Sequence, residues 1–119
     1  MPEVREYQEG DNIFHEGDRA AEAYVVRSGT VEVVREGPNR ERRSIATFSR
    51  GDVFGEMALI DDEPRMGSAF ATKNTELLVI KRLELMDRLE NSDPVVFRLL
   101  KTLSQRLRIE AESRDGDPK

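Results

Sequence analysis

The stretch VFGEMALIDDEPRMGSAFA, residues Val53–Ala71, decides the fold because its pattern changes twice over a short length. Val53-Phe54 and Ser68–Ala71 carry the aromatic, β-branched and small residues of short strands, whereas Glu56 to Ile60 are good helix formers. Gly55 stands at the first change, where a residue without a Cβ permits a tight turn and the close approach of a ligand. We therefore predict a strand, one short helical turn, a loop and a second strand.

The same stretch carries an acid, Glu56, directly after the glycine and a base, Arg65, between a proline and a run of small residues. The unpaired N–H groups of a helical turn suit an anion, and a guanidinium matches phosphate oxygens. Glu56 would repel a phosphate but can accept a hydrogen bond from a hydroxyl. A ligand with a hydroxyl beside an anion would satisfy both residues. The alternative is that both are ordinary surface charges, and Asp61-Asp62-Glu63 between them is expected to be a solvated acidic loop.

Outward from this stretch, short β-branched and aromatic segments alternate with turn signals such as Gly10-Asp11 and Gly51-Asp52. Many short strands at regular spacing are typical of a sandwich or a barrel-like roll. AYVVRSGTVEVVRE, residues 23–36, predicts a β-hairpin around Ser28-Gly29, because Val31 and Val33 alternate with polar residues. The predicted strands are Asn12–His15, Ala23–Arg27, Thr30–Arg35, Ser44–Phe48, Val53-Phe54, Ser68–Ala71 and Leu77–Ile80.

The last quarter of the chain changes to a helical period. KRLELMDRLEN, residues 81–91, predicts one helix, and Asp93-Pro94 predicts the start of another, with Asp93 as its N-cap. The second helix should run to about Glu112 and carry an apolar stripe that packs on the roll, caps a ligand or pairs with a second copy. The stripe consists of Val96, Leu100, Leu103 and Leu107.

The segment FGEMALIDDEPRMGSA, residues 54–69, resembles the phosphate-binding cassette of cyclic nucleotide-binding domains. GDNIFHEGDRAAEAYVVRSGTVEVV, residues 10–34, and RGDVFGE, residues 50–56, are similar to the β-roll of that family, and the resemblance extends from about Tyr7 to Glu112. It implies a mainly β fold with some α, an antiparallel, jelly-roll-like β-roll followed by C-terminal helices. The expected organisation is a single domain, residues 1–119, with the roll at about 7–81, helices at about 82–90 and 94–112, and a disordered tail at 113–119.

The resemblance also implies roles for individual residues. Glu56 would hold the ribose 2'-hydroxyl, Arg65 would clamp the cyclic phosphate, and the backbone amides around Met57 and Ala58 would help to hold the phosphate, with Gly55 opening the turn.

Met66 departs from the family pattern, because threonine, serine or alanine usually follows the arginine. The missing hydroxyl favours cAMP over cGMP as the ligand. In the family the last helix closes over the base, and the candidates for that contact here are Leu103, Arg106 and Leu107. Nucleotide binding is expected to reposition this helix and so to control a partner or an attached effector, with a homodimer through the helix as one possible assembly.

The composition excludes several other classes of protein. The chain of 119 residues has no cysteine and one histidine, His15, so neither a thiolate site nor a multi-histidine metal site can form. With neither a cysteine nor a second histidine, most nucleophilic mechanisms lack a general base, and no catalytic residue or cofactor is expected. The net charge of −5 disfavours binding to nucleic acid. No long apolar run or signal-peptide pattern is present, so a cytoplasmic location without membrane contact is expected.

Two alternatives remain open at this point. A degenerate roll could keep the fold and serve as a protein-interaction module without binding a nucleotide, although both charged anchors are present. DNA-binding members of the family often carry a helix-turn-helix after the last helix, for which this sequence has no room. The chain is therefore either a free-standing sensor or part of a larger protein.

Overall fold

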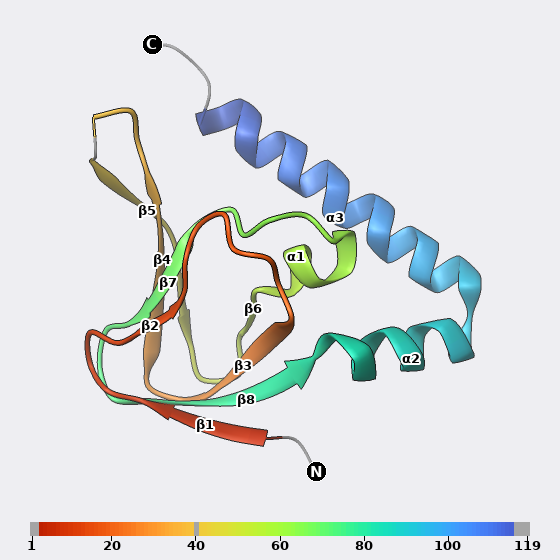
Figure 1. The fold of residues 1–119 in the computed structure, drawn as a ribbon, viewed down its shortest axis with the longest axis horizontal. Coiled ribbons are helices and arrows are strands. Elements are labelled where there is room, and N and C mark those ends of the chain that lie inside the picture. Colours follow the sequence, from red (N-terminus) through yellow and green to blue (C-terminus); the bar gives the residue numbers. More distant parts are fainter. Residues whose placement is uncertain (1–2, 40, 116–119) are drawn as a thin grey trace.

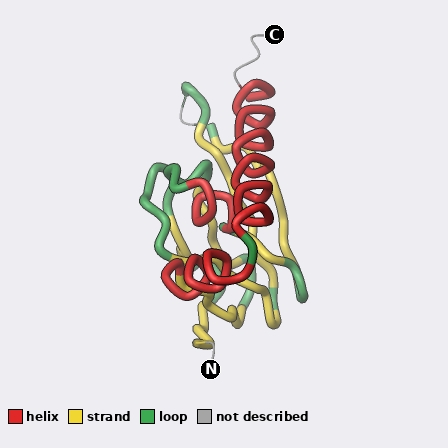
Figure 2. Tube along the Cα trace, turned by 90° about the vertical axis from the view of Figure 1, so that its right-hand side faces the viewer, coloured by secondary structure: helices red, strands yellow, loops and turns green. Residues whose placement is uncertain are grey.

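A computed structural model describes residues 3–39 and 41–115. Two antiparallel sheets form a roll, and the helices gather on one side of it (Figures 1 and 2). The mainly β fold with C-terminal helices is as predicted. The elements are β1 (Glu3–Tyr7), β2 (Asn12–Phe14), β3 (Glu22–Ser28), β4 (Thr30–Glu36), β5 (Arg42–Ser49), β6 (Val53–Phe54), α1 (Glu56–Asp61), β7 (Ser68–Ala71), β8 (Thr75–Lys81), α2 (Arg82–Ser92) and α3 (Pro94–Asp115).

The core lies between the two four-stranded sheets, which have the orders β1-β8-β3-β6 and β2-β7-β4-β5. Alternate residues of each strand point inward because successive side chains of a strand face opposite sides. Both sheets contribute to one cluster of buried side chains: Tyr24, Val26, Val31, Val33, Phe54, Ala69, Leu77 and Val79. The roll therefore has a single continuous core.

The predicted hairpin around Ser28-Gly29 is wrong. β3 pairs with β6 and β8, whereas β4 pairs with β5 and β7, so the chain crosses from one sheet to the other at this corner. Gly29 has a φ of +92°, and a Cβ there would lie 2.5 Å from the carbonyl oxygen of Asn74. The alternating pattern identified both strands correctly but does not specify which strand each one pairs with.

Strand β1 was not predicted, so the roll begins at Glu3 rather than near Tyr7. Its polar sequence, EVREY, lacks the apolar pattern of a buried strand because β1 lies at the edge of its sheet. It pairs with β8, and the guanidinium of Arg5 forms two hydrogen bonds, of 3.0 and 2.9 Å, with the carboxylate of Glu22 on β3. This ion pair ties the edge strand to the sheet.

The helix start at Asp93 and Pro94 is confirmed, since the Asp93 carboxylate accepts a hydrogen bond of 2.9 Å from the N–H of Val95. Both helices run further than expected: α2 ends at Ser92, and α3 continues to Asp115 into the predicted tail. The rest of that tail, residues 116–119, lies outside the described residues.

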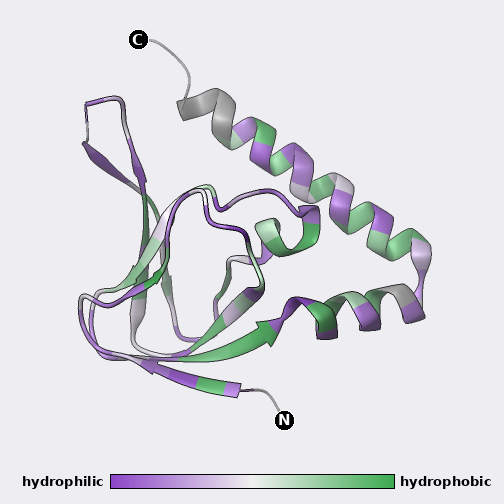
Figure 3. Ribbon diagram, viewed as in Figure 1, coloured by the Kyte–Doolittle hydropathy of each residue, from purple (hydrophilic) through white to green (hydrophobic). Residues whose placement is uncertain are grey.

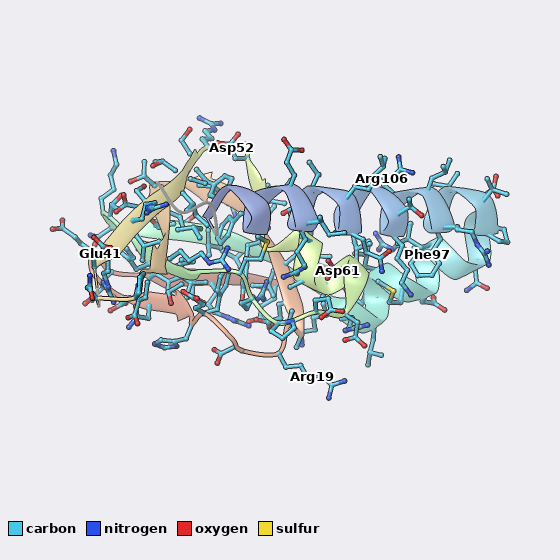
Figure 4. All side chains as sticks on the ribbon, turned by 90° about the horizontal axis from the view of Figure 1, so that it is seen from above. Arg19, Glu41, Asp52, Asp61, Phe97 and Arg106 are labelled. Atoms are coloured by element: carbon cyan, nitrogen blue, oxygen red, sulfur yellow. The ribbon has the colours of Figure 1, made fainter. Side chains whose placement is uncertain are left out.

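The stripe expected on α3 does not pack on the roll, which was one of the three roles left open for it. Val96, Leu103 and Leu107 of the stripe are about half exposed, and Leu100 alone is partly covered. Phe97 instead lies on the side facing α1 and α2, whereas Arg106 points away from α1 (Figure 4). Apolar residues recur along the coloured part of α3 (Figure 3), so the helix has more than one face suited to packing.

Among the described residues, no helix combines the length and the apolar content needed to cross a bilayer. The cytoplasmic location therefore stays a prediction.

Candidate functional site

A cavity of about 260 Å³ opens between α1, the sheet that contains β4 and β5, and the C-terminal part of α3. This volume lies near the lower end of the roughly 300–1,000 Å³ typical of small-molecule sites. All six predicted site residues line it: Gly55, Glu56, Met57, Ala58, Arg65 and Met66. The rest of the lining is mainly apolar and includes Phe14, Ile45, Phe48 and Phe54. The structure therefore brings together the residues that the sequence singled out.

Gly55 shapes the entrance to α1. It is the N-cap with a φ of +78°, and no side chain caps the first amides of the helix. A Cβ at this position would lie 2.8 Å from Nη1 of Arg65, so glycine is required both by the backbone conformation and by the approach of the guanidinium. The half-buried Glu56 follows in the first turn, where the helix dipole favours a negative charge.

Arg65 is the charged centre of the cavity and is only 5% exposed. Its Nη1 donates a hydrogen bond of 2.8 Å to the carbonyl of Gly55, and its Nη2 donates one of 2.6 Å to the carbonyl of Glu22. The guanidinium carbon stands 4.0 Å from the ring centroid of Phe14, a cation–π contact. Nε is buried and has no hydrogen-bond partner in the part of the chain that the structure describes. A buried N–H without an acceptor is costly, so this group favours an anionic ligand.

Burial lowers the pKa of Arg65, and the nearby oxygens of Tyr24, Glu22, Asp18 and Glu56 oppose that shift. The guanidinium remains charged because its ordinary pKa is far above neutrality. The cavity thus holds a permanent positive charge that is only partly solvated.

Aromatic rings form one wall of the cavity. Phe54 stacks on Phe48 and on Tyr24 with ring centroids 5.3 and 5.1 Å apart, and Phe14 lies 6.1 Å from Tyr24. Such offset ring packing makes a rigid apolar surface. The cavity is therefore suited to a ligand that is charged at one end and flat and apolar at the other.

The residues expected to cap a base, Leu103, Arg106 and Leu107, do not line the cavity. Arg108 and Ala111 of α3 line it instead, and the sequence analysis missed both. A second set of residues at helical spacing could have identified them. Phe97, Ser104, Arg108 and Ala111 follow one another at intervals of three, four or seven residues and share the covered face of α3. Small and polar residues carry little weight in a search for apolar stripes.

The expectation that Asp61-Asp62-Glu63 forms a solvated loop is wrong for Asp61. This residue ends α1, and its side chain is fully buried. Nε and Nη2 of Arg108 donate hydrogen bonds of 2.8 and 3.1 Å to its two carboxylate oxygens. Among the described residues no group of three potential metal ligands occurs, in this segment or elsewhere.

Comparison with known proteins places these features in a family. The family described as the cyclic nucleotide-binding domain matches residues 4–92. The chain is 36% identical over 104 residues to the cyclic AMP receptor protein of Thermus thermophilus, which covers 87% of this chain and 48% of that protein. It is 43% identical over 68 residues to a cGMP-dependent protein kinase of Plasmodium berghei, covering 57% of this chain and 7% of the kinase.

Solved structures agree with the sequence comparison. An EAL enzyme in a cAMP-bound form superposes with a TM-score of 0.86 at 28% identity, over 94% of this chain and 30% of that chain. The chain therefore spans about half, or less, of the length of each of these three proteins.

Proposed function

Because the chain belongs to the cyclic nucleotide-binding domain family, we propose that it binds a cyclic nucleotide, cAMP in preference to cGMP, and performs no chemistry on it. The observation that carries this proposal is the buried guanidinium of Arg65, whose Nε has no hydrogen-bond partner among the described residues, beside a cavity that the other predicted binding residues also line. The cyclic phosphate would accept hydrogen bonds from Arg65 and from the amides of Met57 and Ala58. Glu56 would accept one from the ribose 2'-hydroxyl.

The preference for cAMP rests on Met66. A hydroxyl at this position could donate to or accept from the guanine of cGMP, whereas a thioether cannot match it. The similar proteins include examples linked to each nucleotide. One relative is named a cGMP-dependent protein kinase, and one similar solved structure is a cAMP-bound form. The proposed preference for cAMP therefore depends on this one side chain.

The domain would act as a sensor. A nucleotide that prefers the arrangement in which α3 covers the cavity would shift the population towards it, and an attached effector or a partner protein would respond. Arg108 and Ala111, which line the cavity from α3, supply the contacts through which a ligand could favour that arrangement. The half-exposed stripe of Val96, Leu103 and Leu107 would pair with a second copy of the chain.

One observation favours the alternative of an interaction module without a ligand. Nη1 and Nη2 of Arg65 already donate to backbone carbonyls, so the arginine has a structural role whether or not a phosphate is present. Calorimetric titration of the purified protein with cAMP and cGMP separates the two functions. We expect saturable binding of cAMP, weaker binding of cGMP, and a rise in Tm with cAMP. No heat and no shift in Tm with either nucleotide would support the interaction module.

A further inference from the structure

The C-terminal part of α3 is fastened to α1 by hydrogen bonds that all end within residues 57–64. Arg108 binds the Asp61 carboxylate with two donors, and its Nη1 donates a third hydrogen bond, of 2.9 Å, to the carbonyl of Pro64. One turn earlier on α3, the hydroxyl of Ser104 lies 3.3 Å from the carbonyl of Met57 and 3.5 Å from Asp61. α3 packs mainly on α1 and α2, while the cavity lies between its end and the sheet.

The negative charge of Asp61 is energetically unfavourable at its position unless a cation from outside α1 pairs with it. It stands at the C-terminal end of α1, where the helix dipole disfavours a negative charge, and no basic residue lies in the last turn of that helix. Its side chain is fully buried, and that of Arg108 is 11% exposed. A buried ion pair adds little stability compared with apolar packing, but loss of one partner leaves a buried charge unmatched. The pair therefore specifies one seating of α3 on α1 and penalises others.

The pair also explains why the expected apolar stripe faces outward. The bidentate geometry of a guanidinium and a carboxylate fixes direction as well as distance. Once Arg108 faces Asp61, Ser104 and Ala111 must turn towards α1 and the cavity, and Leu103 and Leu107 turn away. Figure 4 shows Asp61 on α1 directly beside α3.

We propose that Asp61 and Arg108 are positioning residues that make α1 and α3 move as one unit. α1 starts with the residues proposed to bind the nucleotide, Glu56, Met57 and Ala58, and ends at Asp61. A six-residue helix is too short to bend, so a shift at its first turn displaces Asp61, and Arg108 carries that displacement into α3. The part of this inference that concerns the ligand rests on the proposed function, whereas the fixed seating of α3 does not.

The test measures the distance between α3 and the roll by electron paramagnetic resonance. The chain has no cysteine, so spin labels can be placed at T47C on β5 and Q105C on α3, both at exposed positions. The background is either the parent or the neutral double variant Asp61→Asn with Arg108→Gln, which leaves no buried charge unpaired. The matched control is Asp62→Asn with Arg82→Gln, which removes the neighbouring exposed ion pair between α1 and α2. A third background, Arg108→Lys, keeps the charge but not the bidentate geometry.

Without nucleotide, we expect a narrow distance distribution in the parent and in the control, and one at least twice as wide in the Asp61/Arg108 double variant, with Arg108→Lys between them. Equal widths in the parent and the double variant would overturn the inference. The measurement without nucleotide tests the seating of α3 even if the domain binds no nucleotide.

With saturating cAMP, we expect the mean distance to shift in the parent and in the control. In the double variant the affinity should fall, because Arg108 also lines the cavity. At a cAMP concentration that calorimetry shows to be saturating, the shift in mean distance should be absent. A shift equal to that of the parent would overturn the inference. Failure of the parent itself to bind cAMP would count against the proposed function and not against the seating of α3.

Discussion

At the scale of the single residue, Arg65 does two things at once. Its Nη1 and Nη2 donate hydrogen bonds to backbone carbonyls before α1 and at the start of β3, and the residue also lines the cavity. Its own backbone is held as well, because its N–H donates to the carbonyl of Asp18 and its carbonyl accepts from Gly17, each at 2.9 Å. The guanidinium is thus positioned before any ligand arrives, which reduces the entropy lost on binding.

Arg65→Gln should weaken cAMP binding strongly, because the phosphate loses a charge-assisted partner inside a poorly solvated cavity. We expect a loss of about 2–5 kcal/mol of binding free energy, measured by calorimetry. Arg27→Gln is the control, since Arg27 is exposed and lies outside the cavity. An unchanged affinity in Arg65→Gln would remove Arg65 from the binding site.

Glu56→Gln should reduce the affinity less and change the selectivity between two ligands. The parent should bind cAMP more tightly than 2'-deoxy-cAMP by about 1.5–3 kcal/mol, the value of a hydrogen bond to a charged group. In the variant the difference should shrink, because the acceptor is neutral. Competition binding with both nucleotides measures this, and a preserved difference would assign the hydroxyl to another residue.

At the scale of the element, the strand that the sequence analysis missed makes an ion pair with a measurable pH dependence. Hydrogen bonds from Arg5 on β1 hold the pKa of Glu22 below its usual value, despite an opposing effect of burial. A carboxyl group whose pKa is lower in the folded state stabilises the fold above its unfolded pKa, and the contribution disappears as the pH falls through the folded pKa.

Arg5→Gln should therefore lower the free energy of unfolding near neutral pH. The effect should shrink as the pH falls below the usual Glu pKa of about 4.3 and vanish once the pH is below the lowered pKa of Glu22, where the carboxyl is protonated in both states. Urea unfolding at a series of pH values measures this. Glu76→Gln is the control, because Glu76 meets Arg27 only in an exposed pair at 3.8 Å. Parallel stability curves for Arg5→Gln and the parent would show that the pair does not stabilise β1.

The corner between β3 and β4 supplies a second prediction at this scale. Gly29→Ala and Gly17→Ala both force a residue with a Cβ to a φ near +90°, at a cost of about 1–2 kcal/mol each. A Cβ at Gly17 meets nothing within 4 Å, whereas one at Gly29 meets the backbone of Asn74 and Thr75. Gly29→Ala should thus lower Tm clearly more than Gly17→Ala. Equal losses would mean that the corner relaxes freely.

At the scale of the whole molecule, the exposed stripe of α3 predicts an assembly. Leu103→Glu places a charge in the middle of the stripe and should convert a dimer to a monomer in sedimentation experiments. Gln105→Glu is the control, since it adds the same charge on an exposed position outside the stripe. A parent protein that stays monomeric at all concentrations, with and without cAMP, would show that the stripe meets something other than a second copy.

The sequence predicted the class of fold, and the six site residues that it suggested all line one cavity. Both follow from the cassette from Phe54 to Ala69, because it is local and its turn chemistry is strict. The sequence did not predict the features that depend on contacts between residues far apart in the chain. Alternation in Val31 and Val33 identifies a strand but not its neighbour, and the polar β1 is a strand only because β8 lies beside it. The face of α3 depends on Asp61 and Arg108, two charges far apart in the sequence that no periodic pattern connects.

The central place of β8 has a consequence for how the protein is made. β8 lies between β1 and β3, so Glu3 pairs with Val79 and Tyr24 with the same residue from the other side. Loop-closure entropy must be overcome before such distant segments can meet, and domains rich in them fold slowly. During synthesis, β1 and β3 therefore leave the ribosome before β8 does. Their backbone groups that pair with β8 stay without that partner until β8 has been made. In that interval the nascent chain is exposed to aggregation, and a chaperone that shields strand edges would raise the yield of native protein.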